Sequence, residues 1–428
     1  MNWKTIIVIF ISFLLFVPFI VSANLAPESD WIVSLGGNRE EIIYDIIQTS
    51  DGGYIATGMT ASKSSSNDVY VVKLSPAGEV EWENNYGDIK EDYAKSIRQT
   101  SDRGYIIGGG TRSFNVGVID YYIIKLDSSG EVQWEKKYGG SQTDMCETII
   151  QTEDGGYMAA GQSWQNILEG NMYLIKLDPS GNKEWDKTIG GGPEDGAYDI
   201  MQTPDSGYIV AGYTRSTTDG SYEAYIVKTD PDGNVEWSRD FGGGSDDQAF
   251  SLEQHRDGYV VAGYTKSHGE SSDTYVVKVD LDGDLVWEKT FGGRDTEEVA
   301  QSISKTSDGG YILAGKTNQY TYGAYDLYLL KLDSNGNEQW SQVFGGENDD
   351  FGYCAIQNSK GGFTAAGQTK STGFGGDVYI IKTKDPLVSK TSGTSRSGDI
   401  PEYGSPSPGI VFCFLMLITA GLVIGRRS

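Results

Sequence analysis

The chain has 428 residues, among them 57 glycines and 27 tyrosines, and its 60 acidic against 34 basic side chains give a net charge of −26. So acidic a chain repels phosphate backbones, which argues against nucleic acid as a partner and favours cations and basic surfaces. The length would suit two or three ordinary domains, but one repeated unit fills most of the chain, so the repeat determines the architecture.

The N-terminal segment has the features of a signal peptide. Lys4 precedes an apolar run over residues 5–20, and Val21-Ser22-Ala23 supplies the small-x-small pattern that signal peptidase cleaves. We expect residues 1–23 to be removed and the protein to be exported. The alternative is an uncleaved membrane anchor, against which the short run and the small residues argue.

Residues 24–385 contain seven copies of one unit. Each copy has a turn ending in Gly-Tyr or Gly-Phe, as in Asp154-Gly155-Gly156-Tyr157, followed by a Tyr-x-x-Lys strand. Tryptophans recur about every 50 residues, the size of a propeller blade. They are Trp31, Trp82, Trp134, Trp185, Trp237, Trp287 and Trp340.

Residues 90–138 illustrate the strands expected in each unit. The pattern predicts strands over 93–100 and 105–111, a variable loop, and two further strands over 120–127 and 131–137, with tight turns at 101–104 and 128–130. Each unit is therefore a four-stranded antiparallel meander. The third strand is apolar on both faces, as in Val69-Tyr70-Val71-Val72, so neighbouring units must cover both.

The two ends of the repeat region complement each other. Trp31 has no strands of its own unit before it, and the last unit stops near Asp385 without a fourth strand. If the strand around Trp31 paired with the third strand near Tyr379, it would complete the seventh unit and remove two exposed edges. The predicted fold is all-β: a seven-bladed β-propeller with four antiparallel strands per blade, closed by the N-terminal strand joining the last blade. We expect it to be monomeric.

The C-terminal segment has the features of a membrane attachment. Residues 386–408 are rich in Ser, Thr, Pro and Gly and should form a stalk. The apolar run from Gly409 to Gly425 just reaches the length of a membrane span, and Arg426-Arg427 fits the cytoplasmic side. Residues 409–428 are therefore expected to be a transmembrane anchor or a sorting signal that holds the propeller at the cell surface.

Two resemblances support these expectations. The tail resembles the C-terminal sorting signals of archaeal surface proteins, although Pro408-Gly409-Ile410 has isoleucine where their Pro-Gly-Phe motif has an aromatic residue. The repeats resemble those of secreted bacterial and archaeal proteins with Asp-Gly-Gly-Tyr units, and the segment from Lys125 to Trp134 looks like the tryptophan-docking motif of quinoprotein propellers. Both repeat resemblances imply a propeller, and neither implies an activity.

The residues that usually carry catalysis are missing from the sequence. Cys146 and Cys354 fall in different units and are expected to be buried small side chains, while His255 and His268 have no third metal ligand at a suitable spacing. There is no His-Glu-x-x-His, no Gly-x-Ser-x-Gly and no phosphate-binding loop. We therefore predict no catalytic residue and no required cofactor.

A carboxylate stands just before the first strand of every unit, on the face that also carries the variable loops. If these acids converge at the mouth of the channel, their repulsion would attract calcium or a cationic ligand. The alternative is that they accept hydrogen bonds from loop amides or pair with lysines of the next blade. The seven are Glu41, Asp92, Asp144, Asp195, Asp247, Glu298 and Asp350.

Two further sets of residues could contribute to a site. Trp164, Tyr320 and Tyr322 lie in variable loops, where aromatic rings beside acids are typical of sugar or peptide binding, although packing within the loop is an equal alternative. The seven strand-three lysines are expected to be structural, each paired with a turn carboxylate such as Asp102 or Asp308.

Two functions of different class remain. The first is a non-catalytic module that binds a surface protein, a carbohydrate or a wall polymer through its acidic variable-loop face. The second is an enzyme: a glycan-cleaving hydrolase or lyase that uses ring carboxylates, or a quinone-dependent dehydrogenase. Two isolated carboxylates about 5 to 10 Å apart in a deep pocket would favour the hydrolase, and an unbroken sevenfold ring would favour binding. The missing catalytic motifs favour the first.

Overall fold

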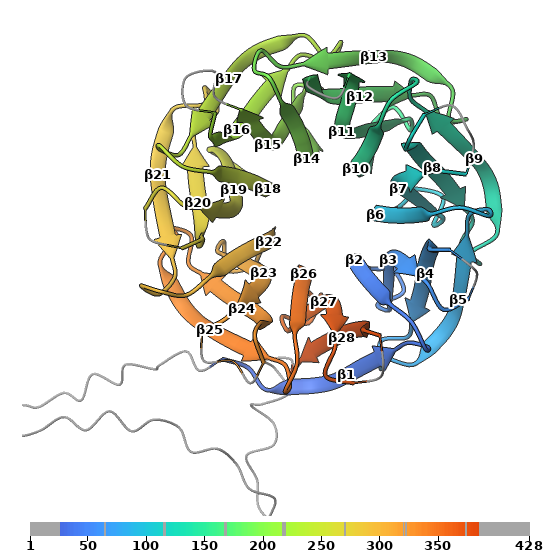
Figure 1. Cartoon of the computed structure of the whole chain (residues 1–428), viewed down its shortest axis with the longest axis vertical. Coiled ribbons are helices and arrows are strands. Elements are labelled where there is room, and N and C mark those ends of the chain that lie inside the picture. The colour runs from blue at the N-terminus through green and yellow to red at the C-terminus, as the bar shows by residue number, and fades with distance from the viewer. Residues whose placement is uncertain are drawn as a thin grey trace, which may run out of the picture.

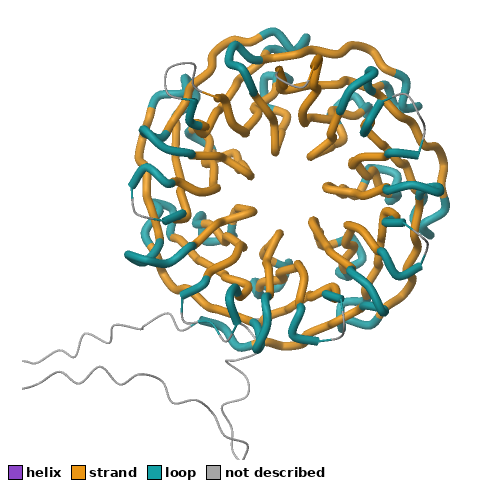
Figure 2. Tube along the Cα trace, viewed as in Figure 1, coloured by secondary structure: helices purple, strands orange, loops and turns teal. Residues whose placement is uncertain are grey.

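Seven four-stranded sheets are arranged as blades around a central axis (Figure 1). The computed structural model describes residues 26–384, apart from 64–65, 114–116, 167–168, 216–219, 269–270, 320, 322 and 373–374. These described residues form 28 strands and no helix, and turns and loops connect the strands (Figure 2). The predicted all-β seven-bladed propeller is confirmed.

The first three blades follow one another along the chain. Blade 1 contains β2 (Glu41–Gln48), β3 (Tyr54–Thr60), β4 (Asp68–Leu74) and β5 (Val80–Tyr86). Blade 2 contains β6 (Asp92–Gln99), β7 (Tyr105–Thr111), β8 (Asp120–Leu126) and β9 (Val132–Tyr138). Blade 3 contains β10 (Asp144–Gln151), β11 (Tyr157–Asn166), β12 (Glu169–Leu177) and β13 (Lys183–Ile189).

The next three blades repeat this order. Blade 4 contains β14 (Asp195–Gln202), β15 (Tyr208–Arg215), β16 (Tyr222–Thr229) and β17 (Val235–Phe241). Blade 5 contains β18 (Asp247–His255), β19 (Gly258–Thr265), β20 (Asp273–Val279) and β21 (Leu285–Phe291). Blade 6 contains β22 (Glu298–Lys305), β23 (Tyr311–Thr317), β24 (Asp326–Leu332) and β25 (Glu338–Phe344).

The seventh blade joins the two ends of the described chain. Its strands from the axis outward are β26 (Asp350–Gln357), β27 (Phe363–Thr369), β28 (Asp377–Thr383) and β1 (Ser29–Leu35). The blue β1 runs beside the orange β28 in Figure 1, antiparallel, with Trp31 opposite Lys382 and Ser34 opposite Tyr379. The predicted closure by the N-terminal strand is therefore confirmed, and β28 is paired on both sides.

The hydrophobic core lies between neighbouring blades. The third strands β4 and β8 are buried along their whole length, and the other five over most of theirs, as predicted from their continuous apolar sequence. One cluster, for example, packs Ile43 and Val72 of blade 1 against Val378 and Ile380 of blade 7. Every blade is therefore stabilised by two neighbours, and an isolated blade would leave both faces of its sheet in water.

Each outer-strand tryptophan packs on the next blade. The ring of Trp134 in blade 2 lies over Gly181, in the turn between β12 and β13 of blade 3. A β-carbon added to Gly181 would come within 2.8 Å of this ring. Its ring also meets Tyr157 edge-on, with centroids 5.7 Å apart. Trp340 has no such glycine, because in blade 7 the turn before the fourth strand is replaced by the junction of the two chain ends. This explains why the sequence has seven tryptophans and only six such glycines.

Six of the seven strand-three lysines pair with turn carboxylates, as predicted. Lys125 Nζ lies 2.9 Å from Asp102, and Lys331 Nζ lies 2.9 Å from Asp308. The lysines are buried while the acids are about half exposed. Cys146 and Cys354 are both free and buried, also as predicted.

The expected terminal segments lie outside the described residues. The signal peptide (1–23), the stalk (386–408) and the anchor (409–428) all fall there. Within the part of the chain that the structure describes, no helix is long and apolar enough to cross a membrane.

Candidate functional site

The seven acids before the inner strands are buried and hold the loops that connect one blade to the next. Asp350 is typical: its Oδ2 accepts hydrogen bonds from the Gly346 amide at 2.7 Å and the Ser371 hydroxyl at 2.9 Å. Each of the other acids also accepts a bond from an amide of the preceding loop: Glu41, Asp92, Asp144, Asp195, Asp247 and Glu298.

This geometry favours the second of the two alternatives for these acids. None of the seven lines the cavity in the central channel, and all are at most 3% exposed. They lie between blades rather than around the channel mouth. Within the described residues, no group of three or more His, Cys, Asp or Glu side chains is arranged to hold a metal ion.

Of the three aromatic candidates, only Trp164 can be placed. It lies within β11, paired with Gly170 of β12, and not in a loop as expected. Its ring is half-buried against Gly170. Tyr320 and Tyr322 are outside the described residues. The structure therefore does not bring the three together in one described site.

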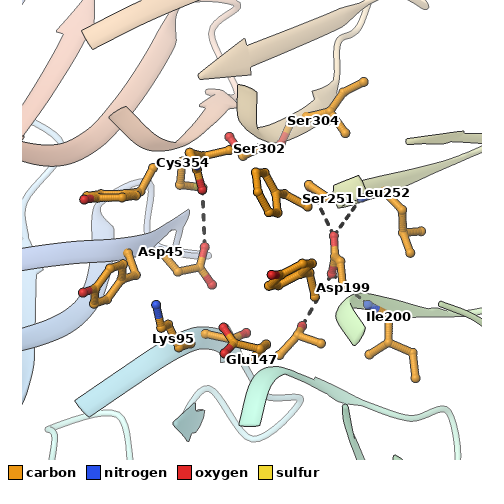
Figure 3. Close-up of a pocket in the computed structure, with 18 of the residues that line it drawn as sticks. Asp45, Lys95, Glu147, Asp199, Ile200, Ser251, Leu252, Ser302, Ser304 and Cys354 are labelled. Atoms are coloured by element: carbon orange, nitrogen blue, oxygen red, sulfur yellow. Dashed lines mark hydrogen bonds between the residues drawn. The ribbon is translucent and has the colours of Figure 1, made fainter. Parts of the chain in front are cut away.

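The central channel contains a cavity of about 330 Å³. Inner strands of different blades contribute to it, and Figure 3 shows Asp45, Lys95, Glu147 and Asp199 around it. Its volume is at the lower end of the range for small-molecule sites.

A β-bulge in every inner strand sends one extra residue into this channel. In β2, for example, the pairing with β3 skips Tyr44, which lies between Ile43 and Asp45. A bulge re-aims a side chain and lets consecutive residues reach one side of a strand, and both Tyr44 and Asp45 do line the cavity. The seven bulge residues are Tyr44, Lys95, Glu147, Tyr198, Phe250, Gln301 and Tyr353.

These seven residues, one from each blade, also line a smaller cavity of about 180 Å³ by themselves. We call them the bulge ring. Four members are aromatic, one is basic, one acidic and one an amide. The blades are otherwise nearly equivalent, so the bulge ring is where the sevenfold repetition is broken by different chemistry.

The aromatic members of the bulge ring contact one another. The rings of Tyr44 and Tyr353 have centroids 5.1 Å apart, and those of Tyr198 and Phe250 meet edge-on at 4.9 Å. Lys95 Nζ lies 3.9 Å from the centre of the Tyr44 ring, a cation–π contact. Burial, with the charges of Glu40 and Glu147, raises the pKa of Tyr44 to about 12, so it is a neutral hydrogen-bond donor at physiological pH.

Glu147 is the member of the bulge ring whose carboxylate accepts no hydrogen bond from the described residues. Its carboxylate makes no hydrogen bond or ion pair with any residue that the structure describes, although Lys95 is in the same ring. Glu147 is half-buried in the channel wall. An acceptor in this position can receive a hydrogen bond from a ligand without first losing one from the protein.

Two other channel carboxylates are engaged in joining blades. Asp45 accepts a bond from the Ile97 amide of the next blade at 2.9 Å and from the Arg98 guanidinium. Asp199 accepts bonds from the Leu252 amide at 2.9 Å and the Ser251 hydroxyl at 3.2 Å (Figure 3). Each therefore bonds the backbone of the following blade, a structural role.

Glu253 also lines the larger channel cavity. Its carboxylate accepts a bond from the Lys305 amide at 3.2 Å. Burial raises the pKa of Glu253 to about 7, against the effect of that hydrogen bond and with a contribution from the charge of Asp199. Glu253 therefore changes its charge near neutral pH.

Sequence reasoning missed the bulge ring. A bulge is difficult to recognise in a sequence, because the extra residue only shifts the alternation of buried and exposed side chains by one position. The signal was nevertheless present: three residues after each acid, the type of side chain varies from blade to blade, whereas the residues around it repeat.

The comparisons with known proteins add the class of the fold. No family model matches the chain, and neither does any curated protein sequence. The WD40 domain of Pan2 from Neurospora crassa is similar in structure, with a TM-score of 0.50 and 13% identity over 80% of this chain and 89% of that one. A protein of unknown function from Dyadobacter fermentans gives 0.46 and 10%, over 84% and 99%. At these identities the likeness shows the fold alone: the protein is a seven-bladed β-propeller with WD40-like structural neighbours.

Proposed function

We propose that this protein is a non-catalytic binding module of the cell surface, and that the bulge ring is the centre of its binding site. The ligand is a carbohydrate or a surface protein that inserts a narrow group into the channel. The observation that carries the proposal is the convergence of seven side chains of five residue types, one per blade, at a single level of the channel.

The composition of the bulge ring supports a ligand that is partly polar. Aromatic faces such as those of Tyr198 and Phe250 stack on sugar rings or apolar side chains, while Gln301 and Glu147 can form directional hydrogen bonds. The free carboxylate of Glu147 favours a hydroxyl or an amine over an anionic group. A cavity of about 180 Å³ at this level limits what enters to one small unit of a larger ligand.

The channel carboxylates support binding rather than hydrolysis. A glycosidase needs one carboxylate as acid and a second as nucleophile or base. Asp45, Asp199 and Glu253 already accept amide hydrogen bonds from the next blade. Among the carboxylates that line the channel cavity, this leaves Glu147 without such a bond in the described structure. No specific observation favours a quinone-dependent reaction.

The location of the module is part of the proposal. The apolar run over residues 5–20 with its small-residue cleavage pattern supports export, and the apolar segment from Gly409 to Gly425 supports attachment at the C-terminus. The net charge of −26 would give such a surface module a preference for partners that present hydroxyl or cationic groups.

The test begins with a screen of the purified protein against glycans and surface-protein fragments, followed by calorimetry on each hit. Tyr198→Ala and Phe250→Ala should each weaken binding at least tenfold, while thermal melts verify that the variants are folded. Trp164→Ala is the matched control, because this aromatic lies in an outer hairpin and should leave the affinity unchanged. A hit that loses affinity with Trp164→Ala and not with the ring variants would move the site to the outer loops and contradict the proposal.

A further inference from the structure

At five of the seven junctions between blades, the glycine after the outer strand packs against two polar side chains. One is the acid that begins the inner strand, and the other lies at or near the start of the third strand in the preceding blade. Asp120 of blade 2 and Asp144 of blade 3 illustrate this arrangement at Gly139, and Asp326 and Asp350 repeat it at Gly345.

The two carboxylates of such a pair lie close to each other. A β-carbon added to Gly139 would lie 2.4 Å from Asp120 Oδ1 and 2.7 Å from Asp144 Oδ2. The two oxygens are therefore no more than about 5 Å apart, a separation at which like charges repel by more than 1 kcal/mol once they are shielded from water. Both residues are at most 3% exposed.

An oxygen of the pair lacks a hydrogen-bond donor. Asp120 Oδ2 accepts a bond from the Gly117 amide at 3.1 Å, but Asp120 Oδ1 is buried and has no donor among the described residues. The equivalent Oδ1 atoms of Asp68 and Asp377, at two other junctions, are also buried without a donor in the described structure. A buried carboxylate oxygen without a partner is costly, and its recurrence at three junctions requires a common explanation.

The surroundings of Asp120 Oδ1 contain further oxygen atoms. A β-carbon added to Gly117 would lie 2.9 Å from Asp120 Oδ1, 2.9 Å from the Gly140 carbonyl oxygen and 2.2 Å from that of Gln142. Carboxylate and main-chain carbonyl oxygens are the ligands that calcium prefers, and calcium accepts irregular geometry with six to eight of them. Magnesium requires near-ideal octahedral geometry and is the poorer fit to a set built largely from backbone.

We propose that calcium binds between adjacent blades at these carboxylate pairs, with Asp120 and Asp144 forming the best-defined site. The ion would receive the donorless oxygen of Asp120, neutralise the repulsion within the pair and hold the two blades together. Burial together with the charge of Asp144 raises the pKa of Asp120, against the opposing effects of the Gly117 amide and the charge of Lys137.

One junction between blades lacks the second carboxylate and can be compared with the junction of Asp120 and Asp144. At the junction of blades 3 and 4, Asn171 takes the place of the third-strand acid and faces Asp195 across Gly190. One negative charge is absent there, so this junction should bind calcium more weakly than that of Asp120 and Asp144. Neither Asp120 nor Asp144 lines the channel cavity, so calcium binding and ligand binding in the bulge ring can fail independently.

The experiment uses the purified full chain, freed of metal with a chelator and dialysed. Calcium chloride is then added at constant ionic strength while the melting temperature and the number of bound ions per chain are measured. We expect the melting temperature to rise by several degrees, more than one ion to bind, and Asp120→Asn to bind one fewer. Asp68→Asn serves as a second variant at another junction, in case Asp120→Asn folds poorly.

Asp232→Asn is the matched control, because it removes a charge from an exposed turn without touching a carboxylate pair. It should bind as many ions as the wild type. The proposal is overturned if the melting temperature is unchanged at millimolar calcium, if Asp120→Asn and Asp232→Asn lose ions equally, or if magnesium stabilises as well as calcium does. The proposal is also overturned if Asp120→Asn stabilises the chain equally with and without calcium. The two carboxylates of the pair would then share a proton and would not bind a calcium ion.

Discussion

Lys382 Nζ lies 2.8 Å from Asp30 Oδ2 although 352 residues separate them in the sequence. The contact joins β1 to β28 and is the seam of the ring. Lys382 is buried and Asp30 about half exposed. The carboxylate of Asp30 therefore neutralises an ammonium group that is shielded from water. In each of the other six blades, the third-strand lysine pairs with an acid of the first turn of the same blade. In blade 7, Asp30 from the opposite end of the chain provides the carboxylate instead.

Asp30→Asn should therefore weaken the closure of the ring. Removing one partner of a pair whose other member is buried costs about 1–3 kcal/mol in the free energy of unfolding. Urea unfolding would measure this loss. Glu28→Gln is the control, since it removes an exposed acid that pairs with Lys384 on the same seam, and it should leave the unfolding midpoint unchanged. Equal effects of the two variants would show that the seam does not depend on the buried lysine.

Gly181→Ala should destabilise the propeller through the tryptophan contact. Gly181 has φ +76°, which alone costs an alanine about 1 kcal/mol, and the new methyl would also meet the Trp134 ring at 2.8 Å. We expect a total loss of about 2–4 kcal/mol in the free energy of unfolding.

Gly309→Ala is the control for Gly181→Ala, because its φ is +83° but nothing lies within 4 Å of the added carbon. Blades 2 and 4 already carry Arg103 and Ser206 with positive φ in their equivalent turns. The control should lose only about 1 kcal/mol. If both variants lose the same amount, the tryptophan contact contributes nothing.

Low pH should weaken the ion pairs between the third-strand lysines and the turn aspartates. Hydrogen bonds from Lys278 and His255 lower the pKa of Asp257 to about 2, below the value of about 3.9 for an unfolded aspartate. Because the unfolded chain then binds the proton more readily, the stabilisation is complete above about pH 4 and is lost as the pH falls towards 2. The difference in melting temperature between wild type and Asp257→Asn should accordingly shrink from pH 5 to pH 2.5. A difference that stays constant over this range would contradict the pairing.

Glu253 should have the opposite pH dependence. Its folded pKa of about 7 lies above that of an unfolded glutamate. The folded state therefore holds the proton more tightly, and stability falls as the pH rises from about 4.5 to 7. Glu253→Gln keeps an oxygen for the Lys305 amide and removes the charge, so it should be more stable than wild type at pH 8 by on the order of 1–2 kcal/mol. At pH 4 the two should be equal, and a gain of the same size at both pH values would exclude the titration of Glu253.

The fold could be predicted largely from sequence because its strongest determinants are local and repeated. The Asp-Gly-Gly-Tyr turns, the buried third strands and the tryptophan spacing each recur, and the unmatched Trp31 and Tyr379 segments indicated the closure. The side-chain direction of the seven acids could not be decided, because an acid at a strand end can face the axis or the next blade equally well. The bulge ring was missed because a one-residue bulge changes which side of a strand faces the channel without changing composition.

The most direct test of the account is the structure of the protein with a ligand identified by the screen. We expect a group of the ligand to lie between the rings of Tyr198, Phe250 and Tyr44, within hydrogen-bonding distance of Glu147. A ligand bound only on the outer loops, with the bulge ring unchanged and in contact with solvent, would contradict it.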